Sequence, residues 1–158
     1  YGPESPYLAQ VSDTEQLKAT IADLKTSSDF IVITMHAGTE YTREANWQQK
    51  EFARAAIDAG ADMVIGAHPH WIQPIERYNG KYIFYSLGNF VFDQSWSQDT
   101  KEGLTLKISL TKTDMQTMLK QVELIPIVIE NNSQPRLANE TETQSILKKI
   151  GANESVLK

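Results

Sequence analysis

The sequence predicts an α/β fold in which parallel strands with helices are followed by an antiparallel meander. Two short apolar runs rich in β-branched residues, 30–35 and 62–66, each follow a segment with helical periodicity. A strand, helix, strand order makes the two strands parallel and brings their C-terminal ends to one edge of the sheet. Further along, Asn79 and Gly80 separate two extended runs, and this dipeptide is preferred in two-residue hairpins.

The first helix is expected over residues 13–26. Ser12, followed three residues later by Glu15, has the spacing of a capping box, and apolar residues recur on one face of the segment. The strand at 30–35 follows at once and shows no alternation of polar and apolar residues. We therefore expect it to be buried on both faces and to end at His36.

The second helix is expected over residues 47–59. Asn46 and Gln49 supply its N-terminal cap, and Gly60 stands where a C-terminal cap belongs. The strand at 62–66 comes next and ends just before His68.

The second half of the chain changes to antiparallel structure. Strands are expected at 72–78 and 81–86 around the hairpin turn, and apolar residues alternate with polar ones over 104–110. Residues 119–130 form another extended run, in which Pro126 suggests an edge strand or a bulge.

The remaining residues, 131–158, are expected to be a polar tail with a short helix. Residues 131–139 are polar and rich in turn formers, and the helix is expected over 141–150 with its end at Gly151.

Composition fits one soluble globular domain. The 158 residues are 41% hydrophobic and 22% charged, which is enough for one buried core. The net charge of -5 makes a phosphate backbone a poorly matched partner, so we expect no nucleic-acid binding. No apolar run is long enough to span a membrane, and the start at Tyr1 without an initiator Met suggests a piece of a longer protein.

The histidines are the candidate metal ligands. The chain has three histidines and no cysteine, and His36, His68 and His70 all fall at the ends of the two parallel strands. In an extended segment, side chains two apart point the same way, and Pro69 favours an extended His68. Imidazole binds divalent transition metals well, so a metal site is one interpretation; histidines with ordinary hydrogen bonds are the other.

Two further residues lie near these strand ends. Glu40 follows His36 by four residues, close enough to orient a ligand imidazole, although a solvated loop carboxylate fits equally well. Asn89 follows a strand in a tight turn, and from the residues alone it reads as a turn former.

Three blocks resemble the CapA family of poly-γ-glutamate capsule synthesis proteins, which is related to calcineurin-like metallophosphatases. These blocks are residues 36–41 (HAGTEY), 60–70 (GADMVIGAHPH) and 82–92 (YIFYSLGNFVF). The resemblance covers most of residues 29–92. It implies that residues 1–158 are the C-terminal part of a single CapA-type domain, half of a calcineurin-like metallophosphatase sandwich.

The resemblance also implies roles for the histidines. His36, His68 and His70 would be ligands of a dinuclear site holding manganese, zinc or iron, with His36 and His70 also catalytic and with Glu40 and Asn89 beside them in the pocket. The implied chemistry is metal-assisted hydrolysis of a phosphate ester. The Asp, Gly-Asp and Asn-His motifs that complete such sites are not found in this sequence, so this chain alone is expected to be inactive and to need an upstream half of the same domain.

The resemblance leaves a second interpretation open. The chain would then be a non-enzymatic accessory protein that binds the polymer or its synthase and export machinery. In either case, the resemblance implies a location at the extracellular face of a bacterial membrane or in the cell envelope.

Overall fold

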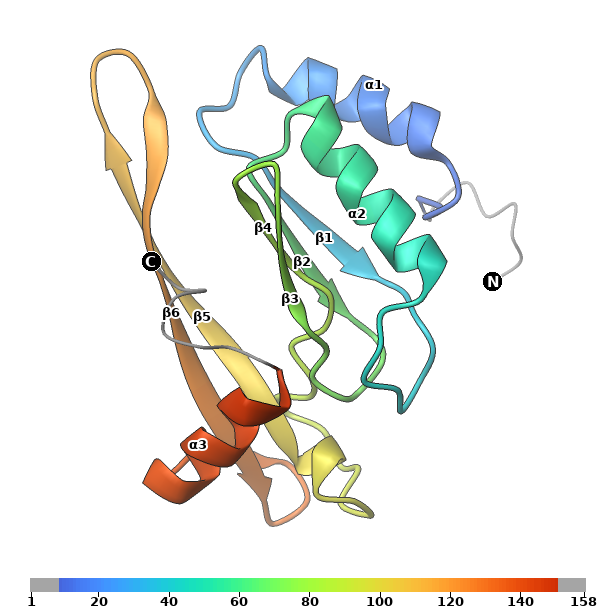
Figure 1. Cartoon of the computed structure of the whole chain (residues 1–158), viewed down its shortest axis with the longest axis vertical. Helices are drawn as coiled ribbons and strands as arrows, with labels where there is room; N and C mark the ends of the chain where they lie inside the picture. Colours follow the sequence, from blue (N-terminus) through green and yellow to red (C-terminus); the bar gives the residue numbers. More distant parts are fainter. Residues whose placement is uncertain (1–8, 151–158) are drawn as a thin grey trace.

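The computed structural model describes residues 9–150 as a mixed α/β fold with two sheets (Figure 1). The first sheet has the strand order β1-β2-β4-β3. In it β2 runs parallel to β1 and to β4, and β3 pairs antiparallel with β4. Its strands are β1 (Val32–His36), β2 (Met63–Ala67), β3 (Ile75–Tyr78) and β4 (Lys81–Phe84). The expected parallel pair and hairpin are both confirmed.

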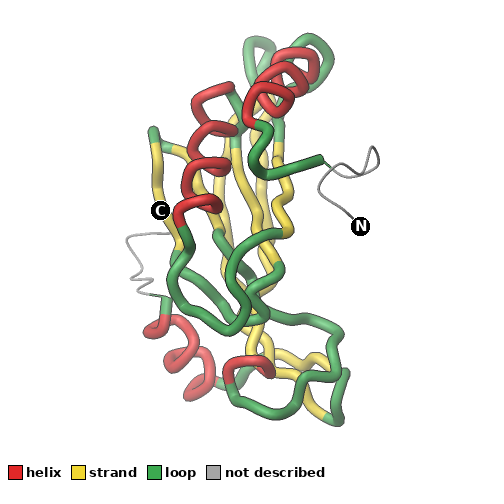
Figure 2. The backbone as a smooth tube through the Cα atoms, turned by 90° about the vertical axis from the view of Figure 1, so that its right-hand side faces the viewer, coloured by secondary structure: helices red, strands yellow, loops and turns green. Residues whose placement is uncertain are grey.

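Two helices, α1 (Thr14–Leu24) and α2 (Trp47–Ala59), cover one face of this sheet (Figures 1 and 2). The capping box of Asn46 and Gln49 is confirmed at α2. The predicted cap at Ser12 is wrong, because the Asp13 carboxylate accepts a hydrogen bond from the Gln16 backbone amide (2.9 Å). An aspartate directly before a helix is an efficient cap, so the helix begins one residue later.

The expectation that the first strand is buried on both faces is wrong. Met35 faces the helices and is buried, but Val32 on the other face is 39% exposed. Within residues 9–150, β1 is an edge strand, and only its helix-facing side is covered. By contrast, Met63 and Val64 of β2 are both fully buried, since the second sheet covers that strand.

The second sheet is an antiparallel meander with the order β5-β6-β7, as expected. Its strands are β5 (Glu102–Lys112), β6 (Thr117–Glu130) and β7 (Gln134–Leu137). β7 lies in the segment expected to be only polar turns. Positive φ angles at Asn131 and Asn132 reverse the chain, and pairing with β6 then makes the polar residues a strand.

The inference that Pro126 marks an edge strand or bulge is wrong. β6 is the central strand, and the register shift lies at Ser109 and Leu110 of β5. Opposite Pro126, the Leu104 amide donates to Leu87 rather than to β6. The Pro126 carbonyl accepts from Ala138, just beyond the end of β7. The proline therefore sits where the ladder with β7 ends, and its missing N–H leaves no strand partner unsatisfied.

The hairpin turn and the last helix match their expectations. Asn79 and Gly80 both have positive φ, 48° and 78°, as the predicted turn requires. The last helix, α3 (Glu140–Lys149), is capped by Asn139 and packs against β6. The predicted helix end at Gly151 and the rest of the tail lie outside the described residues. No helix within residues 9–150 is long and apolar enough to cross a membrane.

Candidate metal centre

The carboxyl ends of β1 and β2 lie side by side and bring the histidines together. In the parallel register, His36 is opposite Ala67, the residue before His68. The ring centroids of His36 and His68 are 5.1 Å apart, and those of His68 and His70 are 6.0 Å apart. The convergence predicted from the strand order is therefore present in the fold.

The backbone of the histidine pair is strained. His68 has φ 105° and His70 has φ 61°, so the prediction of an extended His68 is wrong. A positive φ in a non-glycine residue costs on the order of 1–3 kcal/mol and persists only where surrounding contacts enforce it. One such contact is the Tyr41 backbone amide, which donates to the Pro69 carbonyl (2.9 Å). The pair is thus held against the loop that follows β1.

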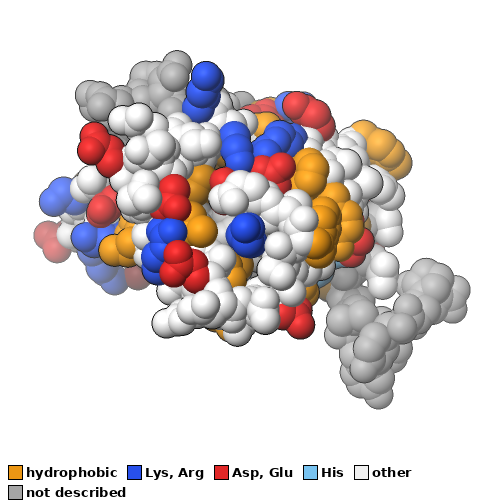
Figure 3. Space-filling view, turned by 90° about the horizontal axis from the view of Figure 1, so that it is seen from below, with side chains coloured by type: hydrophobic (Ala, Val, Ile, Leu, Met, Phe, Trp, Pro, Cys, Tyr) orange, Lys and Arg blue, Asp and Glu red, His pale blue; other side chains and the backbone are white. Residues whose placement is uncertain are grey.

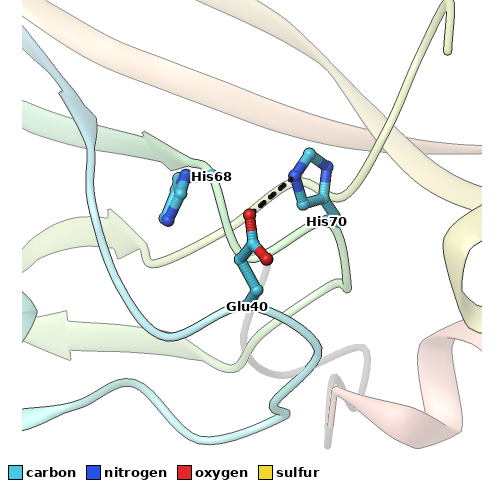
Figure 4. Close-up of side chains that lie close together, drawn as sticks. All are labelled: Glu40, His68 and His70. Atoms are coloured by element: carbon cyan, nitrogen blue, oxygen red, sulfur yellow. Dashed lines mark ion pairs between the residues drawn. The ribbon is translucent and has the colours of Figure 1, made fainter.

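Glu40, His68 and His70 form the group of potential ligands in residues 9–150. Their ligand atoms lie within 4.8 Å of one another, and Glu40 Oε1 is 3.7 Å from His70 Nε2 (Figure 4). The expectation that Glu40 lies close enough to orient a ligand imidazole is met at His70. His36 stands beside this group through its contact with His68.

Asn89 orients the His70 ring. Its Oδ1 is 2.9 Å from His70 Nδ1, while its Nδ2 donates to the Thr100 carbonyl (3.0 Å) and to Gln94 Oε1 (3.3 Å). Two acceptors at Nδ2 assign the amide orientation, so Oδ1 accepts the Nδ1 proton of His70. In a neutral ring the Nε2 lone pair then faces Glu40. Asn89 is 7% exposed, so it does more than form a turn.

Aromatic side chains enclose His70, and the sequence interpretation missed them. Tyr41 stacks on the His70 ring with centroids 5.7 Å apart, and Phe92 lies at 5.1 Å. Trp96 contacts the edge of Tyr41 at 4.8 Å. Tyr41 and Phe92 both fall in the blocks that carry the resemblance, and this position in the sequence could have indicated that they lie near the site. These rings restrict the motion of the imidazole.

The electrostatic setting favours a neutral imidazole at His36. Burial lowers the pKa of His36, and the neighbouring His68 and His70 lower it further, since positive charges there would repel. Neutral imidazole is the form that binds metal ions. His36 is therefore favoured in the neutral form, which can accept a metal ion or a proton.

The three donors fit a small divalent cation. Metal–nitrogen and metal–oxygen bonds are about 2.0–2.2 Å, so two ligand atoms of one ion lie at most about 4.3 Å apart. In this structure the three ligand atoms lie within 4.8 Å of one another, which is slightly wider than that separation. The Glu40 side chain is 49% exposed and free to close the difference by rotation. Two imidazoles and a carboxylate suit zinc, manganese or iron, whereas no thiolate competes in this cysteine-free chain.

A cavity of about 690 Å³ adjoins the centre. It lies between the open face of β1 and β2 and the strand β5, and His36 and Asn89 form part of its wall. Most of its remaining lining is apolar, including Ile65, Leu104 and Leu106. The centre thus stands beside an apolar space between the two sheets.

Comparison with known proteins identifies the family of this chain. A family model described as bacterial capsule synthesis protein PGA_cap matches residues 2–94, which include every candidate site residue. The chain is 46% identical over 101 residues to the PGA biosynthesis protein CapA of Bacillus subtilis (strain 168). It is 38% identical over 109 residues to the capsule biosynthesis protein CapA of Bacillus anthracis. These matches cover 64% and 69% of this chain.

A third relative carries a different description. The chain is 30% identical over 140 residues, 86% of its length, to a probable polyglutamine synthesis accessory protein of Mycobacterium tuberculosis (strain ATCC 25618 / H37Rv). The matches cover 26%, 25% and 36% of the three relatives, so the chain spans well under half of their length.

Proposed function

The chain belongs to the bacterial capsule synthesis protein family PGA_cap, and on this premise we propose that Glu40, His68 and His70 bind a divalent metal ion that serves poly-γ-glutamate capsule synthesis. The observation that carries the proposal is the pairing of His70 with Asn89 on one side and Glu40 on the other. Residues that ligate metals through one imidazole nitrogen commonly donate the other N–H to an oxygen. The Asn89 contact has that form.

The proposed chemistry is hydrolysis of a phosphate ester. A bound divalent ion would polarise the phosphoryl group and lower the pKa of a water nucleophile. In this chain, Glu40, His68 and His70 would hold the ion, and Asn89 would keep the His70 ring in one orientation. His36, whose lowered pKa keeps it neutral, would either bind a second ion or accept a proton from the nucleophile. Besides His36, we propose that His70 is catalytic.

A non-enzymatic accessory role is the alternative, and the description of the mycobacterial relative as an accessory protein favours it. The surface seen in Figure 3 carries acidic and basic side chains next to one another rather than a basic patch. With a net charge of -5, the chain would repel an anionic polymer, so polymer binding would need a metal ion to supply positive charge. The same metal centre could then bridge protein and polymer carboxylates instead of cleaving an ester.

We also propose the setting in which either function would operate. The family description is a capsule synthesis protein, so the synthase and export machinery of the polymer is the proposed partner. The proposed location is the extracellular face of a bacterial membrane or the cell envelope. Crosslinking in encapsulated cells, followed by identification of the linked proteins, would test both points.

Metal binding is the first test. After loading with Mn²⁺ or Zn²⁺ and gel filtration, we expect bound metal in the unaltered chain and its loss in His68→Ala and His70→Ala. Glu40→Gln should weaken binding about 10–100-fold, since one charged ligand is removed. Glu51→Gln, an exposed carboxylate on α2, is the matched control and should bind like the unaltered chain.

The two functions are then separated by activity. A longer form that extends upstream of Tyr1 is assayed on aryl phosphate esters and, in parallel, for binding to poly-γ-glutamate. Metal-dependent turnover lost in His70→Ala supports the hydrolase, and metal-dependent polymer binding without turnover supports the accessory role. An unaltered chain that retains neither metal after loading contradicts the centre itself.

A further inference from the structure

The C-terminal helix is connected to the candidate centre by charged side chains that lie close together. Lys149, in the last turn of α3, contacts Asp99 Oδ1 at 2.8 Å and Glu102 Oε2 at 2.6 Å through its Nζ. Arg43, on the loop that carries Glu40, pairs with the same Asp99 carboxylate. We call Arg43, Asp99 and Lys149 the ionic anchor. It joins three segments that are distant in the sequence.

The ionic anchor reaches the site by two routes. Arg43 is three residues from Glu40 in the loop after β1, and its guanidinium also lies over the Trp71 ring, next to His70. On the other route, Asp99 directly precedes Thr100, whose carbonyl accepts the hydrogen bond from Asn89 Nδ2 (3.0 Å). Asn89 in turn orients His70. Asp99 is therefore connected to both the Glu40 loop and the His70 ring of the proposed centre.

The surroundings make this contact more than an exposed ion pair. Thr100 is fully buried and Glu102 is 4% exposed. Removing Lys149 would leave the Glu102 carboxylate buried without its cation, which costs far more than losing an exposed ion pair. We expect the segment 97–102 to shift in response, and the Thr100 carbonyl would move with it.

We propose that Asp99 and Lys149 are positioning residues of the metal centre, through which α3 sets the orientation of the His70 ring. The proposal rests on the proposed metal function for its effect on affinity, but not for its effect on the ring. Asp99, Glu102 and Lys149 all lie outside the residues matched by the family model. The geometry thus assigns a site role to the part of the chain beyond that match.

The test compares Lys149→Met with Lys148→Met, its exposed neighbour on α3. The first readout is the tautomer of the His70 ring by ¹⁵N NMR without metal at pH 8, above the ordinary histidine pKa of about 6.5. The unaltered chain and Lys148→Met should show the Nδ1–H form, whereas Lys149→Met should populate the Nε2–H form as the contact with Asn89 loosens. The second readout is Mn²⁺ affinity, with an expected loss of about tenfold in Lys149→Met alone.

Two further variants keep the test decisive. Lys149→Arg retains the charge and should restore both readouts, which a purely structural role for Lys149 in α3 would not require. Asp99→Asn keeps the shape of the side chain and should repeat the tautomer change, and it replaces Lys149→Met if circular dichroism shows that variant to be unfolded.

The outcomes separate this proposal from the metal function. A tautomer change in a chain that binds no Mn²⁺ supports the positioning role and contradicts the metal centre. Metal binding with the same tautomer and the same affinity in Lys149→Met and Asp99→Asn supports the centre and overturns the positioning role.

Discussion

The loop that carries Glu40 is held by two polar contacts of different kinds. One is the ionic anchor of Arg43, Asp99 and Lys149. The other is a pair of buried amides, Gln49 and Gln73, which we call the amide anchor; their side chains are joined by a 2.9 Å hydrogen bond. The ionic anchor connects the loop to the segment just before β5 and to α3, whereas the amide anchor connects it to α2 and to the segment between β2 and β3.

Every side-chain polar atom of the amide anchor has a hydrogen-bond partner. Gln73 Nε2 donates to the carbonyls of Thr42 (3.0 Å) and Glu44 (3.1 Å), and Gln49 Nε2 donates to the Tyr85 carbonyl (3.3 Å). None of these hydrogen bonds involves a charged group, so salt and pH should not weaken them. The comparison indicates two separate roles. The amides fix the position of the loop, whereas the ion pairs connect the loop to the distant helix α3.

The largest expected effect comes from breaking the amide anchor. Gln73→Leu leaves the Thr42 carbonyl without its partner and removes one hydrogen bond each from the Glu44 carbonyl and the Gln49 amide, so it should destabilise the fold by about 3 kcal/mol. Urea unfolding measures the change in the free energy of unfolding. Gln121→Leu, an exposed amide on β6, is the control and should change stability by less than about 0.5 kcal/mol. Equal stability of the two variants would contradict a structural role for the amides.

A smaller effect is expected at Gly38, where the loop crosses the amide anchor. Gly38 has φ 137°, and a Cβ there would lie 2.8 Å from the Gln49 side chain. Gly38→Ala should cost about 2 kcal/mol, because strain and crowding add. Gly80→Ala is the matched control, since Gly80 also has positive φ but its Cβ would have nothing within 4 Å. Thermal unfolding of both variants isolates the crowding, and a cost at Gly38 no greater than at Gly80 would exclude it.

The smallest effect concerns pH and the ionic anchor. Burial alone would raise the pKa of Asp99, but hydrogen bonds from Lys149 and Arg43 outweigh it and lower that pKa below the usual value. A lowered pKa in the fold adds stability that is present above the ordinary aspartate pKa of about 3.9 and is lost as the pH falls through the lower folded value.

The unaltered chain should therefore exceed Asp99→Asn in stability at pH 7, and the difference should shrink toward pH 3. Urea unfolding at several pH values provides the measurement, and Gln73→Leu, whose deficit should stay constant with pH, provides the control. A difference that grows as the pH falls would contradict the assignment of the shift to these cations.

Local patterns were sufficient for most of the fold. Caps and periodicity placed α2 to the residue and α3 within one residue at each end, and the Asn79–Gly80 dipeptide located the hairpin. β7 was missed because its residues are polar, and only pairing with β6 makes them a strand. The exposed face of β1 was missed because a continuous apolar run does not reveal what covers it.

The sequence alone determined that His36, His68 and His70 meet, because a strand, helix, strand unit leaves parallel strands ending at one edge. Only the tertiary structure decided that Glu40 faces His70, that Asn89 orients that ring, and that Asp99 and Lys149 connect α3 to the site. The physical reason is range. Strand order follows from short-range patterns, whereas a contact such as the one between Lys149 and Asp99 joins residues 50 positions apart, and its geometry exists only after both sheets have packed.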